Sequence, residues 1–269
     1  ASIPFEWTLH LGEACAELCS DYFSSRYDFE AIYLLFKQMT AYEIGSGDIT
    51  WIESCLRMAN KGKPVLLATG ASDIGDVQRC VDAILAINPQ LVLMQCNTNY
   101  TADPGNFDHI HLNVLKTYHE MWPDLILGLS DHTHGHATVL GAVALGVRVV
   151  EKHFTDDNSR EGPDHAFAMN PDSWAEMVEN TRQLERALGS GNKVVAGNEQ
   201  ETVVVQRRCL RAARNIRRGE NFTREMIDVL RPATPGAIMP YDIDKVIGSV
   251  ALADLEKGQD LRWLDLGRA

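Results

Sequence analysis

The segment that most constrains the fold is residues 124–155, which reads as a strand, a polar loop, a helix and a second strand. Residues 125–129 form a short apolar run, and an alanine- and leucine-rich stretch with helical spacing follows at 137–145. Gly146 stands where glycine commonly ends a helix, and the β-branched run 147–150 comes next. Such a βαβ unit places its strands parallel, with both carboxyl ends at one edge of a sheet.

Both predicted strands lead into a histidine. His132 follows Asp131 after the first strand, and His153 lies two residues beyond Glu151 after the second. Neighbouring strands lie about 4.8 Å apart, so both imidazoles could point into one site. Two imidazoles beside Asp131 and Glu151 would suit a divalent metal ion. Alternatively, each histidine bonds only to its own loop, but the equivalent placement of two histidines favours the metal site.

Strand-like and helix-like segments alternate along residues 1–190, as expected for βα units. Polar and glycine residues cluster after the strands, at the edge where a (β/α) barrel has its active site. We predict six strands, near Tyr22, Tyr42, Val65, Leu91, Leu125 and Val147, and helices at 13–21, 29–37, 51–60, 76–87, 106–120 and 172–188. A closed barrel requires eight strands. The pattern therefore fits an open doubly wound sheet, or a barrel whose first two βα units are absent from this chain.

The pattern of predicted elements changes near residue 207, which predicts a second domain. Residues 1–190 form the predicted barrel domain, and residues 191–206 read as a linker. Residues 207–269 carry short strand-like runs separated by turns, with several prolines before a short helix. We expect this tail to be a small compact domain.

Composition excludes several classes of partner. The net charge of −12 argues against nucleic acid or an anionic membrane as the main partner. No apolar run reaches the roughly 18 residues needed to cross a bilayer. The six cysteines are scattered without CxxC pairs, which predicts buried thiols in a reducing, cytoplasmic setting.

Two glycine-containing turns follow predicted strands and could bind an anion. The turn 45–47 (Gly-Ser-Gly) and the turn 69–72 (Thr-Gly-Ala-Ser) offer backbone N–H groups and hydroxyls to a phosphate or carboxylate. Each could equally be an ordinary tight turn, but two at one edge favour an anionic ligand. Other polar residues after strands could contact a substrate or merely bond to loop backbone: Asn97, Thr98, Tyr100, Asp164 and His165.

Several motifs together resemble the sialic acid synthase family, the N-acetylneuraminate synthases and their relatives that make other nonulosonic acids. They are EIGSGD at 43–48, LATG at 67–70, GLSDHT at 128–133, EKHFT at 151–155, GPDH at 162–165 and LRP at 230–232. The tail, residues 207–269, resembles the antifreeze-like domain of that family. The match covers nearly the whole chain.

The resemblance implies a (β/α)₈ TIM-type barrel of the α/β class plus a small C-terminal antifreeze-like, β-rich domain. The implied reaction condenses phosphoenolpyruvate with N-acetylmannosamine or a related N-acyl aldose, giving a nonulosonic acid and phosphate. His132 and His153 match metal ligands for Mn²⁺ or Mg²⁺, which would polarise the sugar aldehyde. Glu151 and Asp48 match catalytic carboxylates, and a further set matches substrate contacts: Ser46, Ser130, Thr98, Tyr100, Asp164 and Arg231. The match of Arg231 to an arginine inserted into the partner's site implies a domain-swapped homodimer.

Four positions depart from the family pattern. Glu43 replaces a lysine, Ala68 a serine, Asp48 a glutamate and Thr98 an asparagine. The first two βα units of the family also have no counterpart in this sequence. Two other functions therefore stay open: a metal-dependent barrel aldolase or hydrolase that does not use phosphoenolpyruvate, and a non-catalytic paralogue that binds a sugar or a metal.

Overall fold

The computed structural model describes residues 5–25 and 39–267 of the 269-residue chain. The chain divides into two compact units, Ala1–Gly189 and Ser190–Ala269, and each has its own hydrophobic core. Within the described ranges, no helix is long and apolar enough to cross a membrane.

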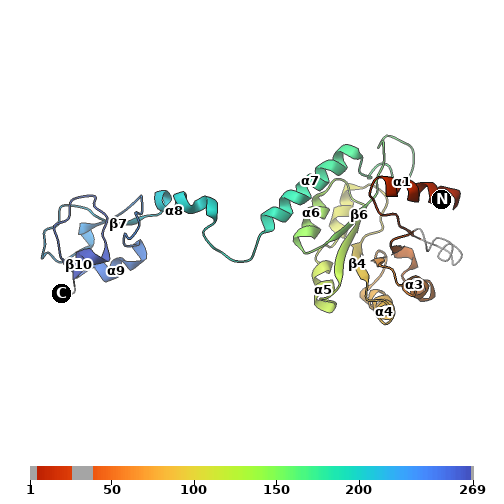
Figure 1. Cartoon of the computed structure of the whole chain (residues 1–269), viewed down its shortest axis with the longest axis horizontal. Coiled ribbons are helices and arrows are strands. Elements are labelled where there is room, and N and C mark those ends of the chain that lie inside the picture. Colours follow the sequence, from red (N-terminus) through yellow and green to blue (C-terminus); the bar gives the residue numbers. More distant parts are fainter. Residues whose placement is uncertain (1–4, 26–38, 268–269) are drawn as a thin grey trace. The chain divides into compact units, whose positions relative to one another are not determined.

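The first unit is built on six parallel strands that pair with one another in chain order (Figure 1). The strands are β1 (Ser24–Ser25), β2 (Tyr42–Ile44), β3 (Val65–Ala68), β4 (Leu91–Cys96), β5 (Ile126–Asp131) and β6 (Val149–Lys152). Described helices precede, connect or follow them: α1 (Phe5–Glu17), α3 (Ile52–Ala59), α4 (Ile74–Leu85), α5 (Val114–Met121), α6 (Ala137–Ala144) and α7 (Pro171–Leu188). The predicted parallel α/β sheet is confirmed.

Alternation along the strands gives this sheet two different faces. Leu67 and Leu93 pack with buried residues of the helices in the main core of the unit. Leu66 and Met94 point the other way and belong to a smaller cluster, which includes Cys96 at the end of β4 and, among the described residues, no helix residue. We call the side of this smaller cluster the inner face, and α3 to α7 pack against the other face.

Local sequence explains where two of the helices begin. Asp73 precedes α4, and its carboxylate accepts hydrogen bonds from the N–H groups of Gly75 and Asp76 at 2.8 and 3.0 Å. Asn170 and Ser173 form a reciprocal capping box at the start of α7. Such caps satisfy N–H groups that have no partner within the helix.

Two helix predictions need correction. The single helix expected at 106–120 is wrong, because the chain forms the 3₁₀ segment η2 (Pro104–His109) and then α5. His111 between them has a φ of 49°, in the left-handed region, which ends any continuous α-helix. The helix expected at 13–21 lies earlier, as α1. The helix expected at 29–37 falls outside the described residues.

The second unit contains two small antiparallel sheets. In one, β7 (Cys209–Ala212) pairs with β8 (Ile227–Leu230), and in the other β9 (Val250–Ala251) pairs with β10 (Leu266–Gly267). The short helix α9 (Ile243–Val246) packs into the same core through Val246. Part of the segment read as a linker is helical, since α8 spans Gln200–Gln206.

Candidate functional site

The two histidines expected to share a site do lie together at the carboxyl ends of β5 and β6. Ser130 is the register partner of Glu151, so the residues two further along, His132 and His153, also leave their strands at matching levels. The imidazole centroids are 5.1 Å apart. Alternation places all four side chains on one side of the sheet.

Glu151 has two carboxylate oxygens in different surroundings. The hydroxyl of Ser130 donates a hydrogen bond of 2.8 Å to Oε1. Oε2 is buried and has no hydrogen-bond partner among the described residues. A buried polar atom without a partner is costly. The free oxygen therefore marks a position where a cation, a water molecule or a substrate hydroxyl would be stabilised.

His132 is held in one orientation by the loop after β4. Its Nδ1 donates to the backbone carbonyl of Asn97 at 2.8 Å, which leaves Nε2 as the atom that carries a lone pair. The residue is 4% exposed, and this burial lowers the pKa of His132 below its usual value. The imidazole is therefore neutral at pH 7, as a metal ligand must be.

Two aromatic rings surround the histidines. The ring of Tyr100 lies 4.4 Å from His132 and 5.6 Å from His153, measured between centroids. The ring of Phe167 lies 6.0 and 5.1 Å from the same imidazoles. Asp164 approaches from the loop after β6, with Oδ2 3.6 Å from Nδ1 of His153. The structure thus places the predicted residues Tyr100 and Asp164 beside the two histidines.

A second cluster joins the ends of β2, β3 and β4. The N–H of Gly70 donates to the Ser46 hydroxyl at 2.9 Å. A Cβ added at Gly70 would lie 2.5 Å from Thr98 and 3.1 Å from the Cys96 sulfur. Ser46, Thr98 and Cys96 therefore converge on one point, and only glycine leaves room there. This brings together two of the predicted substrate contacts.

Cys96 is a site residue that the sequence analysis missed. Its sulfur lies 4.0 Å from Nδ1 of His132 and so connects the two clusters. Burial raises the pKa of the Cys96 thiol, while hydrogen bonds with Ser46 and Ser130 act in the opposite direction. The sequence did contain a sign of this position. Side chains alternate between the two faces of a strand, so Cys96 lies on the same face as Val92 and Met94 of β4.

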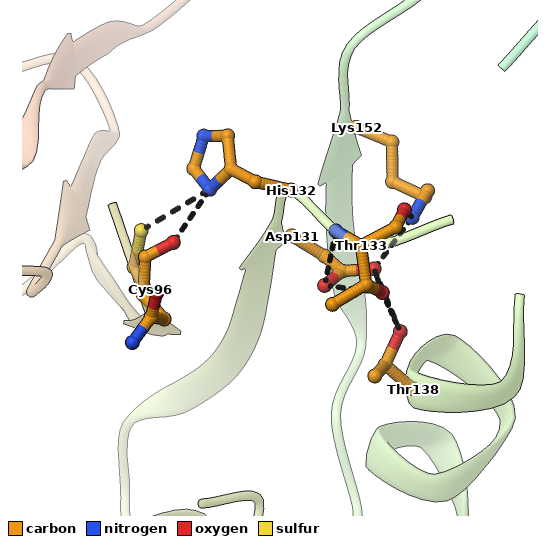
Figure 2. Close-up of polar contacts among 7 residues, drawn as sticks. Cys96, Asp131, His132, Thr133, Thr138 and Lys152 are labelled. Atoms are coloured by element: carbon orange, nitrogen blue, oxygen red, sulfur yellow. Dashed lines mark hydrogen bonds and ion pairs between the residues drawn. The ribbon is translucent and has the colours of Figure 1, made fainter. Parts of the chain in front are cut away.

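Asp131 does not belong to the metal-ligand set that the sequence suggested, and that expectation is wrong. Its carboxylate points to the opposite side of the sheet and binds Lys152 at 2.5 Å (Figure 2). Adjacent residues of a strand face opposite sides, so Asp131 and His132 cannot both face the inner side.

The contacts described above involve neither Asp48 nor Arg231, two of the predicted site residues. Burial raises the pKa of Asp48 in the 3₁₀ segment η1 (Ser46–Asp48), but no hydrogen bond among the described residues links its side chain to either histidine. Arg231 belongs to the second unit, where it is exposed directly after β8. Their assigned roles stay predictions.

A cavity of about 1070 Å³ opens beside these clusters, over the ends of β3 and β4. Its wall includes Thr98 and Tyr100. The volume is at the upper end of what small-molecule sites use. Its other lining residues include Thr69, Ser72, Asn97, Asn99, His109 and Tyr118.

The side chains of this site supply only part of the coordination that a divalent cation needs. Nε2 of His132, the His153 imidazole and the free Oε2 of Glu151 supply nitrogen and oxygen donors. Among the described residues, however, no three His, Cys, Asp or Glu side chains are grouped closely enough to hold a metal ion by themselves. The arrangement suits a cation held by the two imidazoles, with water or substrate oxygens completing its coordination.

Comparison with known proteins identifies the family. The NeuB family matches residues 1–193, and the SAF domain matches residues 207–267. An uncharacterized protein of Methanocaldococcus jannaschii is 36% identical over 248 residues, covering 91% of this chain and 72% of its own length. The N,N'-diacetyllegionaminic acid synthase of Legionella pneumophila is 31% identical, covering 94% and 71%.

Solved structures agree with this match. The spore coat polysaccharide biosynthesis protein spsE of Bacillus subtilis is 28% identical with a TM-score of 0.64, covering 100% of this chain and 79% of its own. The N-acetylneuraminic acid synthetase of Leptospira borgpetersenii shares the fold, with 24% identity and a TM-score of 0.69 over 75% and 70%. The barrel and antifreeze-like fold expected from the motifs is confirmed, and the chain belongs to the NeuB family, with a C-terminal SAF domain.

Proposed function

We propose that this protein condenses phosphoenolpyruvate with N-acetylmannosamine or a related N-acyl aldose, giving a nonulosonic acid and inorganic phosphate. Relatives named as legionaminic acid, pseudaminic acid and N-acetylneuraminate-9-phosphate synthases support this reaction class. The observation that carries the proposal is the inner-face group of Ser130, Glu151, His132 and His153, with Oε2 of Glu151 buried and unpartnered.

His132 and His153 are the proposed ligands of a Mn²⁺ or Mg²⁺ ion. Such an ion would supply Lewis acidity at the aldehyde oxygen of the sugar. The protein contributes orientation: the bond from Nδ1 of His132 to Asn97 fixes the imidazole and leaves Nε2 with the lone pair that a metal ion would accept. Tyr100 and Asp164, which lie against the same imidazoles, are the proposed sugar contacts.

The proposed reaction has two bond-forming steps. The enol carbon of phosphoenolpyruvate attacks the aldehyde carbon, and the aldehyde oxygen takes up a proton. Water then adds to C2 of the resulting cation, and phosphate leaves by cleavage of its C–O bond, which generates the ketone. Oε2 of Glu151 is the proposed acceptor of the proton from this water, because it is the free oxygen of a carboxylate whose other oxygen is held by Ser130.

The remaining assigned residues complete the proposal. Ser46 and Ser130 bind phosphoenolpyruvate, and Thr98 lines the adjoining cavity. Asp48 is a second proposed catalytic carboxylate. Arg231 is proposed to reach the site of a partner subunit in a domain-swapped homodimer, as the resemblance of the C-terminal domain implies.

Two departures at the inner face favour a second candidate function. Glu43 pairs in register with Leu66, whereas its neighbours Tyr42 and Ile44 pack toward the helices, so Glu43 occupies an inner-face position. Ala68 lies on the same face and lacks a hydroxyl. A carboxylate in place of a cation disfavours a phosphate ligand, so an aldolase or hydrolase that does not use phosphoenolpyruvate is the alternative.

Phosphate release separates these candidates. The protein is incubated with phosphoenolpyruvate, Mn²⁺ and a panel of N-acylmannosamine-type aldoses, with sugar-free and metal-free blanks. Phosphate release that requires both sugar and metal supports the proposal. Metal-dependent turnover of sugar without phosphate release would favour the aldolase or hydrolase. Sugar or Mn²⁺ binding by calorimetry without any turnover would indicate a non-catalytic paralogue.

A further inference from the structure

A buried ion pair lies directly behind the two histidines, on the opposite side of the sheet. Asp131 precedes His132 at the end of β5, and Lys152 precedes His153 at the end of β6. The register pairs Asp131 with Lys152, and Nζ lies 2.5 Å from Oδ2. Figure 2 shows His132 extending toward Cys96, away from the group that contains the ion pair.

The Asp131 carboxylate is the centre of a saturated hydrogen-bond network. Thr133 donates to it through its N–H at 3.2 Å and through its hydroxyl at 3.0 Å, and Thr138 of α6 donates at 2.6 Å. Lys152 also donates to the backbone carbonyl of Thr133 at 2.7 Å. The side chains of Lys152 and Asp131 are 1% and 0% exposed. The network therefore fixes the backbone on both sides of His132 and ties it to β6.

A contribution to the free energy of unfolding does not by itself explain why this ion pair is buried. Removing two charges from water is costly, and apolar replacements for buried ion pairs are often neutral or stabilising. The network does constrain geometry, because three of its bonds join the end of β5 to the start of α6 or to the end of β6. Groups behind metal ligands commonly set the orientation of those ligands.

We propose that the Asp131–Lys152 pair is a positioning device that sets the spacing of the His132 and His153 imidazoles. It contacts neither substrate nor metal and acts only through the backbone that carries the two histidines. The expected effect of the pair on metal affinity rests on the proposed function. Its structural part, the fixing of the two strand ends, is independent of that function.

The test removes both charges together, so that neither is left buried alone. The double variant Asp131→Asn with Lys152→Met keeps the side-chain volumes and an oxygen acceptor for Thr133. Thr138→Val, which removes the hydroxyl that bonds to Asp131 and Thr133 but keeps the ion pair, is a milder variant that decides the question if the double variant does not fold. Val81→Ala, in the core at α4, controls for general destabilisation.

The first measurement is the dissociation constant for Mn²⁺, determined by electron paramagnetic resonance without any substrate. We expect a value about 10 to 100 times larger for the double variant, a smaller increase for Thr138→Val and no change for Val81→Ala. A double variant that binds Mn²⁺ as the wild type does would overturn the inference.

The second measurement is hydrogen exchange of the metal-free protein by mass spectrometry. We expect exchange at least tenfold faster in peptides covering 128–136 and 150–155 of the double variant, with α4 unchanged. If the exchange rate rose uniformly over the whole first unit, or did not rise in these peptides, the pair would be an ordinary structural contact and the inference would be wrong. If the wild type itself binds no Mn²⁺, the proposed metal role fails, while this metal-free comparison still decides whether the pair fixes the strand ends.

Discussion

At the residue scale, the surroundings of the Glu151 side chain give the strongest indication of a catalytic role. One carboxylate oxygen accepts the Ser130 hydroxyl, and the other is buried without a described partner. Folding around an unpaired polar atom costs free energy, and such costs are characteristic of sites that bind or transfer protons. The asymmetry between the two oxygens also makes the role of Glu151 testable with a near-isosteric change.

Glu151→Gln should abolish most turnover while leaving the fold intact. Glutamine keeps the acceptor for Ser130 but cannot take a proton, so we expect phosphate release to fall by about 10²- to 10⁴-fold. Steady-state phosphate release and far-ultraviolet circular dichroism measure the two effects. The matched control is Glu53→Gln, which alters an exposed glutamate of α3. Activity within threefold of the wild type for Glu151→Gln would contradict the assigned role.

Gly70→Ala should impair the phosphoenolpyruvate half of the site. The new methyl group would lie 2.5 Å from Thr98 and 2.9 Å from the Ser46 hydroxyl, so these groups must move. We expect kcat/KM for phosphoenolpyruvate to fall about 10- to 100-fold, as ångström-scale misplacement usually causes. Gly191→Ala, where a Cβ meets nothing within 4 Å, is the control. Unchanged kinetics for Gly70→Ala would place the substrate elsewhere.

At the element scale, strand alternation determines which residues share the site. Parallel pairing of β5 and β6 was predictable from the βαβ pattern, and with it the proximity of His132 and His153. Asp131 was misplaced because adjacency in sequence was treated as adjacency in space. Cys96 follows the same alternation on β4, but no motif drew attention to a single cysteine.

The loop between β4 and α5 could not be predicted from apolar spacing. Its helical periodicity continues across residues 106–120, yet the left-handed φ of His111 separates η2 from α5. A single residue with that backbone conformation leaves no signature in the hydrophobic pattern, because apolar spacing carries no information on whether one residue adopts a positive φ. His111 is also part of the wall of the cavity beside the site.

Asp73→Ala tests the element that borders the same cavity. The substitution removes the carboxylate that caps two N–H groups of α4. We expect a loss of about 1 kcal/mol in the free energy of unfolding, measured by urea denaturation. Asp82→Ala, at an exposed position within α4, should change stability much less. Equal losses for the two variants would show that the cap contributes nothing specific.

At the scale of the whole molecule, the proposed metal site should couple ligand binding to folding. A ligand that binds only the folded state at 100 times its dissociation constant stabilises by about 2.7 kcal/mol. We therefore expect Mn²⁺ to raise the melting temperature of the wild type, as measured by calorimetry, and chelation to reverse the effect. The His132→Ala/His153→Ala double variant is the comparison. Equal stabilisation of that variant by Mn²⁺ would place the metal at another site.

The most direct test of the central claim follows the bridging oxygen of phosphoenolpyruvate. The protein is supplied with phosphoenolpyruvate labelled with ¹⁸O between C2 and phosphorus, together with Mn²⁺ and an N-acylmannosamine-type aldose that supports turnover. Mass spectrometry then locates the label. Condensation with C–O cleavage predicts that the label appears in the released phosphate and that the organic product is a nonulosonic acid. Label retained in the organic product, or pyruvate formed in place of the condensed sugar acid, would contradict the account.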